Sequence, residues 1–236
     1  MNTYVTQAEL NQLRDKFLLF GGQAEVAIAQ ATQALVHRDS VLARLVIDED
    51  DEIDTIESEI DQMCVDLLRF RNSSDDDLRF IVSIVRATPM VERIADHAVN
   101  IARHTLKLNN EPQLKPYIDL PRMANIVHHM LIDALDAMAE HDAKRARAII
   151  LSDKEVDRLY RRIFDELLMF MSTDGSCVVR AAELLFVIKH LERIADYVTN
   201  ICEQVVYMVE GSNIKHCGNL RLTGDESENS GLNLAW

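Results

Sequence analysis

A five-residue stretch, E-R-I-A-D, occurs twice in this chain, and this duplication limits the possible folds more than any other feature. The copies, Glu92 to Asp96 and Glu192 to Asp196, are offset by 100 residues, and Asn-Ile follows each at the same distance. A second set of matches, offset by 103 residues, relates Ala34–Asp54 to Ala137–Asp157. A chain of 236 residues with such a repeat is expected to fold as two similar units in tandem.

Both units are expected to be helical, because apolar residues recur at spacings of three and four through almost the whole chain. The clearest stripe comprises Leu184, Ile188, Leu191, Ala195, Val198, Cys202, Val205 and Val209. Seven Gly and four Pro are few for a strand-rich protein. Each half is therefore predicted to run helix, short turn, long helix, loop, long helix. The predicted fold is all-α, with two tandem, pseudo-symmetric three-helix bundles of the spectrin-repeat type.

Composition along the chain suggests where these units begin and end. Residues 109–121 contain three prolines and two asparagines, which is typical of a boundary. The predicted division is an N-terminal extension (1–9), a first repeat (10–110), a linker (111–118), a second repeat (119–211) and a flexible acidic and polar tail (212–236). Ser73 and Ser74 followed by three Asp predict the capped, acidic start of the third helix, and Pro89 predicts a kink within it.

Charge and motif content exclude several classes of protein. The formal net charge of −14 repels a phosphate backbone, so no nucleic-acid partner is expected. The four cysteines lack the spacings of zinc or redox motifs and are interpreted as reduced thiols of a cytoplasmic protein. No secretion signal is recognisable, and no apolar run approaches the roughly 18 residues of a membrane span, so the protein should meet a membrane only through partners.

The acidic residues of the repeats are the candidate site. Helical residues four apart lie about 40° from one another, so each E-R-I-A-D copy places Glu and Asp on one face with the following Asn. The preceding helix carries Asp pairs at the same spacing, and all pairs flank the apolar stripes. The candidate metal ligands are Asp50, Asp54, Glu92, Asp96, Asn100, Asp153, Asp157, Glu192, Asp196 and Asn200. Converging carboxylates need a counter-charge, and their oxygen atoms suit hard or borderline ions such as Mg²⁺, Mn²⁺, Ca²⁺ or ferric iron.

Two other interpretations remain open. The acids can be solvated helix faces, partly neutralised by Arg93 and Arg193, in which case the protein is a metal-free scaffold. The third and least favoured is a di-metal carboxylate oxidase, because no Glu has a His three residues later, as ferritin-type sites require.

Other residues give weaker signals. No nucleotide-binding or nucleophile motif occurs, so no catalytic residue is assigned and the protein is not expected to be an enzyme. His104 is expected to be a surface side chain because its counterpart in the repeat is Gln204. Gly21 and Gly22 are expected to allow a close helix contact rather than to bind phosphate.

Together, the duplicated three-helix pattern, the E-R-[IL]-x-D-x-x-x-N-I stretch and the D-x-E-x-D stretch resemble the PhoU family over about residues 10 to 211. The resemblance implies a PhoU-like fold and a cytoplasmic homodimer. It also implies that the acidic motifs named above bind divalent or trivalent metal ions (Fe, Mn, Mg, Ca or Zn), singly or in clusters. It also implies a negative regulator of phosphate uptake and of the phosphate-starvation two-component response. The implied partners are the ATPase subunit of the phosphate ABC transporter and the phosphate-sensing histidine kinase.

Overall fold

The computed structural model describes residues 5–69, 74–212 and 214, and of residues 51–54 it describes the backbone alone. These residues form seven α-helices and one 3₁₀ turn, with no strand among them. The elements are α1 (Gln7–His37), α2 (Ser40–Asp48), α3 (Asp50–Leu68), α4 (Asp75–Asn109), α5 (Asp119–Glu140), α6 (Ala143–Thr173), η1 (Gly175–Cys177) and α7 (Val178–Glu210).

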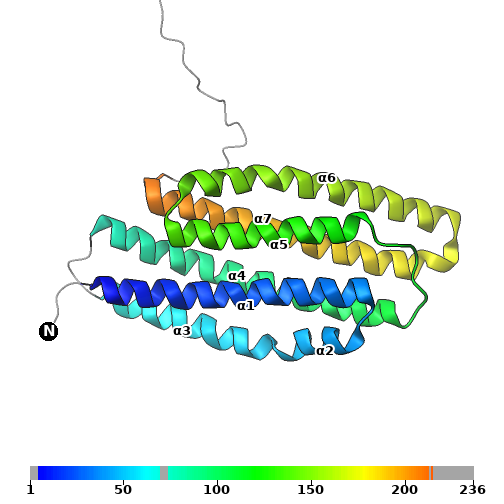
Figure 1. The fold of residues 1–236 in the computed structure, drawn as a ribbon, viewed down its shortest axis with the longest axis horizontal. Helices are drawn as coiled ribbons and strands as arrows, with labels where there is room; N and C mark the ends of the chain where they lie inside the picture. Colours follow the sequence, from blue (N-terminus) through cyan, green and yellow to red (C-terminus); the bar gives the residue numbers. More distant parts are fainter. Residues whose placement is uncertain (1–4, 70–73, 213, 215–236) are drawn as a thin grey trace, which may run out of the picture.

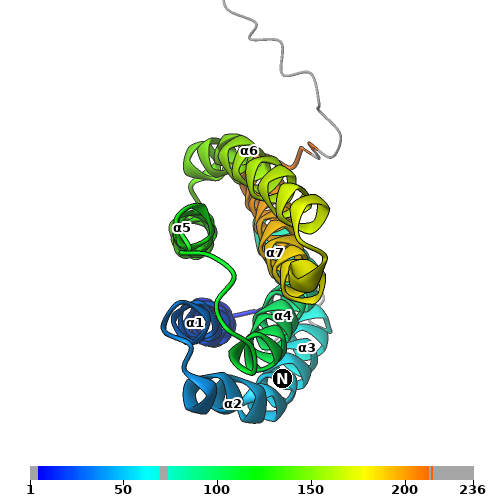
Figure 2. The same cartoon turned by 90° about the vertical axis from the view of Figure 1, so that its right-hand side faces the viewer.

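The helices form two antiparallel bundles that lie side by side, as predicted (Figure 1). The first bundle contains α1, the α2–α3 pair and α4, and the second contains α5, α6 and α7. Viewed end-on, the bundles meet along two helix pairs, α4 with α7 and α1 with α5 (Figure 2). One continuous set of buried apolar side chains runs through both bundles. Among the described helices, none is both long enough and apolar enough to cross a membrane.

Local sequence accounts for the starts of α1 and α4. Thr6 and Glu9 form a capping box at α1, and Ser74 and Asp77 form another at α4, so these side chains satisfy backbone N–H groups that the helix leaves without partners. The prediction of a Ser cap followed by an acidic first turn at α4 is thereby confirmed. The acidic tail proposed for 212–236 lies almost entirely outside the described residues.

The long middle helix predicted for the first half is wrong in one respect, because it breaks at Glu49 into α2 and α3. Residues 48–52 are five consecutive acids, whereas the equivalent residues 151–155 include Ser and Lys and lie in the unbroken α6. Like charges three and four residues apart destabilise a helix. Ending α2 here places the later acids at the N-terminus of α3, where the helix dipole favours negative charge.

Helix α4, in contrast, continues through Pro89. The proline lies on the exposed side of the helix. The carbonyl that loses its hydrogen-bond partner to the proline ring can there be hydrated, which lowers the cost of a proline inside a helix.

The two glycines of α1 behave differently. A Cβ atom on Gly21 would lie 2.4 Å from Cδ2 of Leu135 in α5, so the absence of a side chain allows the two bundles to pack closely. A Cβ atom on Gly22 would meet nothing within 4 Å. The predicted close helix contact is therefore confirmed for Gly21 only.

Helices α4 and α7 pack antiparallel in a register that several contacts fix. Three hydrogen bonds join the helices: Ser83 to Gln204, His97 to His190 and His104 to Glu183. Between successive pairs the residue number rises along α4 by as much as it falls along α7. Four residues before His97 is Arg93, and four residues after His190 is Ile194. The register therefore places the two E-R-I-A-D copies opposite each other at the junction of the bundles.

Candidate functional site

Four predicted acids of the second half lie close together on adjacent helices. Asp153 and Asp157 are on α6, and Glu192 and Asp196 are on α7. Burial and, after it, the negative charges of the other three acids together raise the pKa of Asp153 from 3.8 to about 6. We refer to Asp153, Asp157, Glu192 and Asp196 as the acidic cluster.

The neighbouring residues explain why these helices present acids here. Val156 on α6 and Ala195 on α7 are fully buried, and each precedes one of the acids in sequence. The apolar side chains hold the helices together, while the acids emerge at the edge of their contact, where they are half-buried. Burial and the charge of Glu192 also raise the pKa of Asp196.

Basic side chains partly balance this negative charge. Lys189 lies 2.6 Å from Glu192, Arg193 lies 3.2 Å from Asp196, and Arg161 lies 3.5 Å from Asp157. The Lys189 and Arg193 charges oppose the rise in the pKa of Asp196. Asp153 differs, because no cation is among the causes that shift its pKa. Burial raises this pKa most, and the charges of Asp157, Asp196 and Glu192 add to the rise, so the negative charge around Asp153 is not balanced.

The donor atoms of the acidic cluster fit a hard or borderline cation in chemical type. They are carboxylate oxygens from two helices, with Asn200 one turn beyond Asp196 on α7. Within the described residues, however, no three His, Cys, Asp or Glu side chains are close enough together to hold an ion in their present rotamers. Coordination by this cluster therefore requires the Asp and Glu side chains to turn toward one another.

The corresponding acids of the first half are only partly described. Asp50 is half-buried at the start of α3, and the side chain of Asp54 lies outside the described residues. Glu92 is half-buried, Asp96 is exposed, and Asn100 accepts a hydrogen bond from Arg103. The second-half cluster is consequently the one whose geometry supports a site.

Around the opposed motifs, the two bundles exchange pseudo-symmetric contacts. The Arg93 guanidinium donates a hydrogen bond to the Tyr197 hydroxyl, 3.3 Å away, and lies over the same ring. In the other direction, Arg193 lies near His97, the counterpart of Tyr197 in the repeat, and its charge helps to lower the pKa of that imidazole. The arginines of both motifs thus act across the junction between the bundles.

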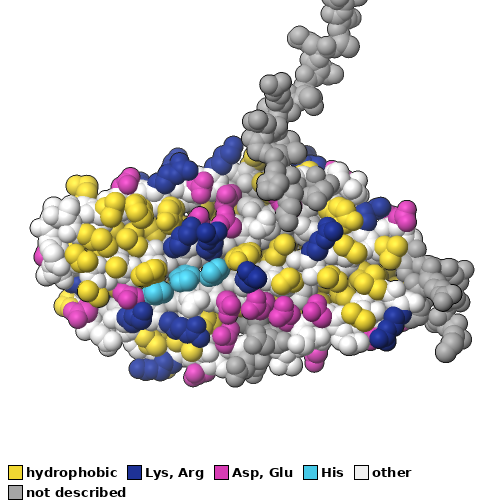
Figure 3. Space-filling model, turned by 180° about the vertical axis from the view of Figure 1, so that it is seen from behind, with side chains coloured by type: hydrophobic (Ala, Val, Ile, Leu, Met, Phe, Trp, Pro, Cys, Tyr) yellow, Lys and Arg dark blue, Asp and Glu magenta, His cyan; other side chains and the backbone are white. Residues whose placement is uncertain are grey.

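A histidine cluster at the same junction was not anticipated from the sequence. Nδ1 of His97 lies 3.0 Å from Nδ1 of His190, and His190 lies beside His104 with 5.4 Å between ring centroids. His104 pairs with Glu183 and is only 14% exposed, so the side chain predicted at the surface is largely covered there. A row of histidine side chains is visible on this face of the molecule (Figure 3). Only the antiparallel register of α4 and α7 could have revealed it, because no short sequence spacing links these residues.

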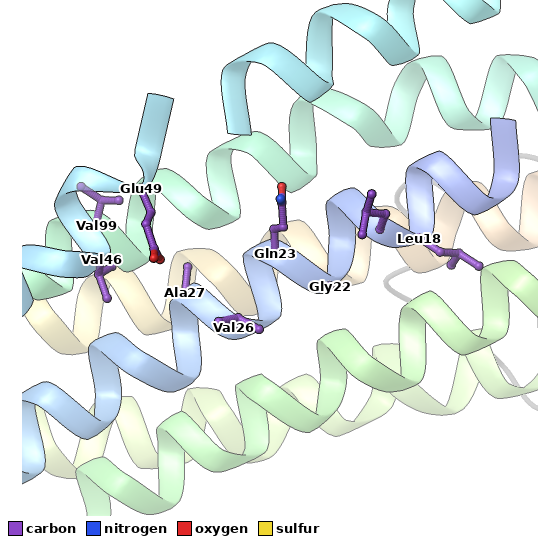
Figure 4. Close-up of a pocket in the computed structure, with 9 residues that line it drawn as sticks. Leu18, Gly22, Gln23, Val26, Ala27, Val46, Glu49 and Val99 are labelled. Carbon is purple, nitrogen blue, oxygen red and sulfur yellow. The ribbon is translucent and has the colours of Figure 1, made fainter. Parts of the chain in front are cut away.

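A separate hollow of about 520 Å³ lies between α1 and the α2–α3 break. Gly22, Val26 and Val46 contribute to a mostly apolar lining, and Gln23 and Glu49 add polar groups (Figure 4). No cluster of acids or histidines borders it in the described part of the chain.

The similarity of the chain to known proteins follows both halves of this architecture. The family model described as the PhoU domain matches residues 17–105 and 120–205. A curated relative from Pseudomonas putida, named phosphate-specific transport system accessory protein PhoU homolog, is 36% identical over 92% of this chain and 86% of its own length. A homolog of the same name from Clostridium acetobutylicum is 36% identical over 91% of this chain and 98% of its own length.

Solved structures agree with the sequence matches. The crystal structure of PhoU from Pseudomonas aeruginosa superposes with a TM-score of 0.84 at 36% identity, covering 87% of this chain and 99% of that one. The phosphate transport system regulatory protein PhoU from Streptococcus pneumoniae gives a TM-score of 0.83 at 33% identity, covering 88% and 98%. With both halves matched in sequence and in structure, the chain belongs to the PhoU family, whose named members are accessory and regulatory proteins rather than enzymes.

Proposed function

We propose that this protein is a cytoplasmic negative regulator of phosphate uptake and of the phosphate-starvation two-component response. It acts as a helical adaptor between the ATPase subunit of the phosphate ABC transporter and the phosphate-sensing histidine kinase. The support is its membership of a family whose relatives are named as accessory proteins of a phosphate-specific transport system. The absence of nucleotide-binding and nucleophile motifs in the sequence agrees with a role through binding.

We further propose that the acidic cluster binds a metal ion. The observation that carries this proposal is the convergence of four half-buried carboxylates from α6 and α7. Burial and then the charges of Asp157, Asp196 and Glu192 raise the pKa of Asp153, in agreement with their proximity. These four carboxylates would hold the ion, with Asn200 as a weaker candidate and the first-half acids as a second site. A bound ion supplies positive charge to the cluster. The acids would hold α6 against α7, and the rigid bundle would present fixed helix faces to both partners.

A metal-free scaffold is the second candidate function, and one specific observation favours it. Lys189, Arg193 and Arg161 already pair with three of the four acids. In this alternative the acids are solvated side chains of α6 and α7 that bind no metal ion. Their removal should therefore leave partner binding unchanged.

Metal analysis of the purified full chain separates the two candidates. The test variant is D153N/D157N/E192Q/D196N. The control is D15N/D61N/E111Q/D165N, which removes the same number of charges from exposed acids. After incubation with Fe, Mn, Zn, Mg or Ca and removal of excess ion, the metal-binding proposal predicts that the test variant loses bound metal that the control retains. Equal metal content in both variants contradicts it.

Partner binding is tested with the same variants. Affinity-tagged wild-type protein should retain the transporter ATPase and the histidine kinase from detergent extracts of the native cells. Under the metal-binding proposal the test variant retains less of either partner than the control does, whereas the scaffold predicts equal retention. If wild-type protein retains neither, the adaptor role is contradicted. Light scattering after size exclusion tests the proposed homodimer by its mass.

A further inference from the structure

The histidine pair between α4 and α7 is a different kind of site from the acidic cluster. His97 belongs to the first bundle and His190 to the second, and both imidazoles are half-buried. Their Nδ1 atoms approach to 3.0 Å, with 5.1 Å between ring centroids. At this distance one Nδ1 donates a hydrogen bond to the other. When both rings instead carry their proton on Nε2, each bundle offers an Nδ1 lone pair to the same small region of the junction.

This separation is close to what a shared metal ion imposes. With metal–nitrogen bonds of about 2.05 Å, two imidazole ligands at a right angle lie about 2.9 Å apart, and two at a tetrahedral angle about 3.3 Å apart. The observed 3.0 Å falls between these values. Coordination requires both rings to turn so that their Nδ1 lone pairs point at the ion, and the broad second side-chain torsion of histidine permits this.

The surroundings keep both rings in place and available as ligands. Tyr197 stacks on His97 at 5.7 Å between centroids, and His104 lies beside His190 while its own Nδ1 is held by Glu183. A neutral imidazole keeps one nitrogen lone pair that it can donate to a metal ion.

Both positively and negatively charged side chains surround the histidine pair. Asp96 and Glu192 act on His97 with negative charge, and Arg93 and Arg193 act on it with positive charge. A divalent ion would therefore not enter a purely cationic environment. Because the described residues bring no third side-chain ligand within reach, water would complete the coordination.

We propose that His97 and His190 form a two-histidine site for a borderline divalent transition ion, such as Ni²⁺, Cu²⁺ or Zn²⁺, that links the two bundles. Nitrogen donors select this class of ion, whereas the carboxylate oxygens of the acidic cluster suit harder ions. The site does not depend on the proposed metal binding by the acidic cluster, because its two ligands lie outside that cluster.

The test uses the purified full chain freed of metal. Calorimetric titration with Ni²⁺ gives affinity and stoichiometry, and the spin-resonance spectrum of bound Cu²⁺ reports nitrogen ligands. The variants are H97A, H190A and H97A/H190A. The matched control is H129A, which removes an exposed histidine of α5, and D153N/D157N controls for the acidic cluster. Circular dichroism confirms that each variant is folded.

The wild-type chain is expected to bind one Ni²⁺ at this site and to show two nitrogen ligands on Cu²⁺. Each single His variant should bind about tenfold more weakly or worse, while H129A and D153N/D157N should retain the affinity within about threefold. Bound Ni²⁺ should also raise the melting temperature of the wild type and not that of H97A/H190A, because the ion joins the two bundles.

Three results overturn the site. They are wild-type chain that binds neither Ni²⁺ nor Cu²⁺, unchanged affinity in H97A/H190A, and a Cu²⁺ spectrum without nitrogen ligands. If affinity is lost in D153N/D157N and kept in H97A/H190A, the ion belongs to the acidic cluster, which supports the proposed function while rejecting the histidine site.

Discussion

The hydroxyl group of Ser83 in α4 donates a hydrogen bond to the backbone carbonyl oxygen of Gln204 in α7, 3.3 Å away. Ser83 is fully buried, so this bond joins the two bundles where water does not compete. It lies on the same antiparallel register that sets the two E-R-I-A-D copies opposite each other. The contact between α4 and α7 is therefore specified by polar groups as well as by apolar packing.

Loss of this bond should weaken the junction. S83A is expected to lower the free energy of unfolding by about 1 kcal/mol, since a buried hydrogen bond of ordinary strength is lost without creating a cavity. S172A is the matched control, because the exposed Ser172 hydroxyl bonds only within its own helix. Denaturant unfolding of both variants measures the effect, and an equal change in S83A and S172A would contradict the role given to Ser83.

The glycine pair of α1 offers an internally controlled test of close packing. G22A should stabilise the protein by about 1 kcal/mol, because alanine is the better helix former and its methyl group meets no neighbour. G21A gains the same helix propensity but forces Leu135 of α5 to move, which costs about 1–3 kcal/mol. G21A should therefore be the less stable of the two in thermal or denaturant unfolding. Equal stability would show that α1 and α5 are not in close contact at Gly21.

Asp153 should make stability depend on pH in a defined direction. Its pKa rises from 3.8 to about 6 on folding, so the folded state binds the proton more tightly than the unfolded state does. The associated stabilisation is complete below about pH 4 and is lost as pH rises to about 6.

D153N removes this dependence. At pH 7 the substitution should raise the free energy of unfolding by about 1–2 kcal/mol, a figure reduced for the partial exposure of the carboxyl group. At pH 4 it should have little effect, because the wild-type side chain is then largely protonated. Unfolding titrations at both pH values, with D165N on the exposed side of α6 as control, provide the measurement. A D153N effect that is the same at both pH values would contradict the raised pKa.

The pair of His104 and Glu183 should contribute more than a surface ion pair does. Their side chains are 14% and 17% exposed, and each bundle supplies one of them. H104A should cost about 1–3 kcal/mol of stability, because it leaves a largely buried carboxylate without its closest partner. H104A/E183Q should be less destabilised than the two single changes added together. Strict additivity in this double-mutant cycle would show that the two residues do not interact.

Helix periodicity and internal repetition were sufficient to predict the all-α fold, because they are local signals. The stripe on α7 was predicted correctly from Leu184 to Val205, and only Val209 near the helix end is exposed. The break at Glu49 was missed because the helical spacing of apolar residues continues across it. The repulsion among five consecutive acids, which destabilises the helix there, leaves that spacing unchanged. The run of acidic residues was the signal in the sequence that could have predicted the break.

The candidate site was predictable in part, because spacing within a single helix is also a local signal. Spacing four placed Asp153 beside Asp157 and Glu192 beside Asp196, and the packing of α6 on α7 brings these two pairs together. The pairing of His97 with His190 depends instead on the register between helices from different repeats. That register results from packing along the full length of α4 and α7, which no single-helix pattern encodes.

The most direct test of the central proposal is a phosphatase reporter of the phosphate-starvation response, measured in phosphate-replete cells that lack this gene. The proposal predicts high reporter activity in these cells, full repression by the wild-type protein, and weaker repression by D153N/D157N/E192Q/D196N produced at the same level. Reporter activity that stays low without the gene, or stays high when the wild-type protein is restored, would contradict the regulatory role.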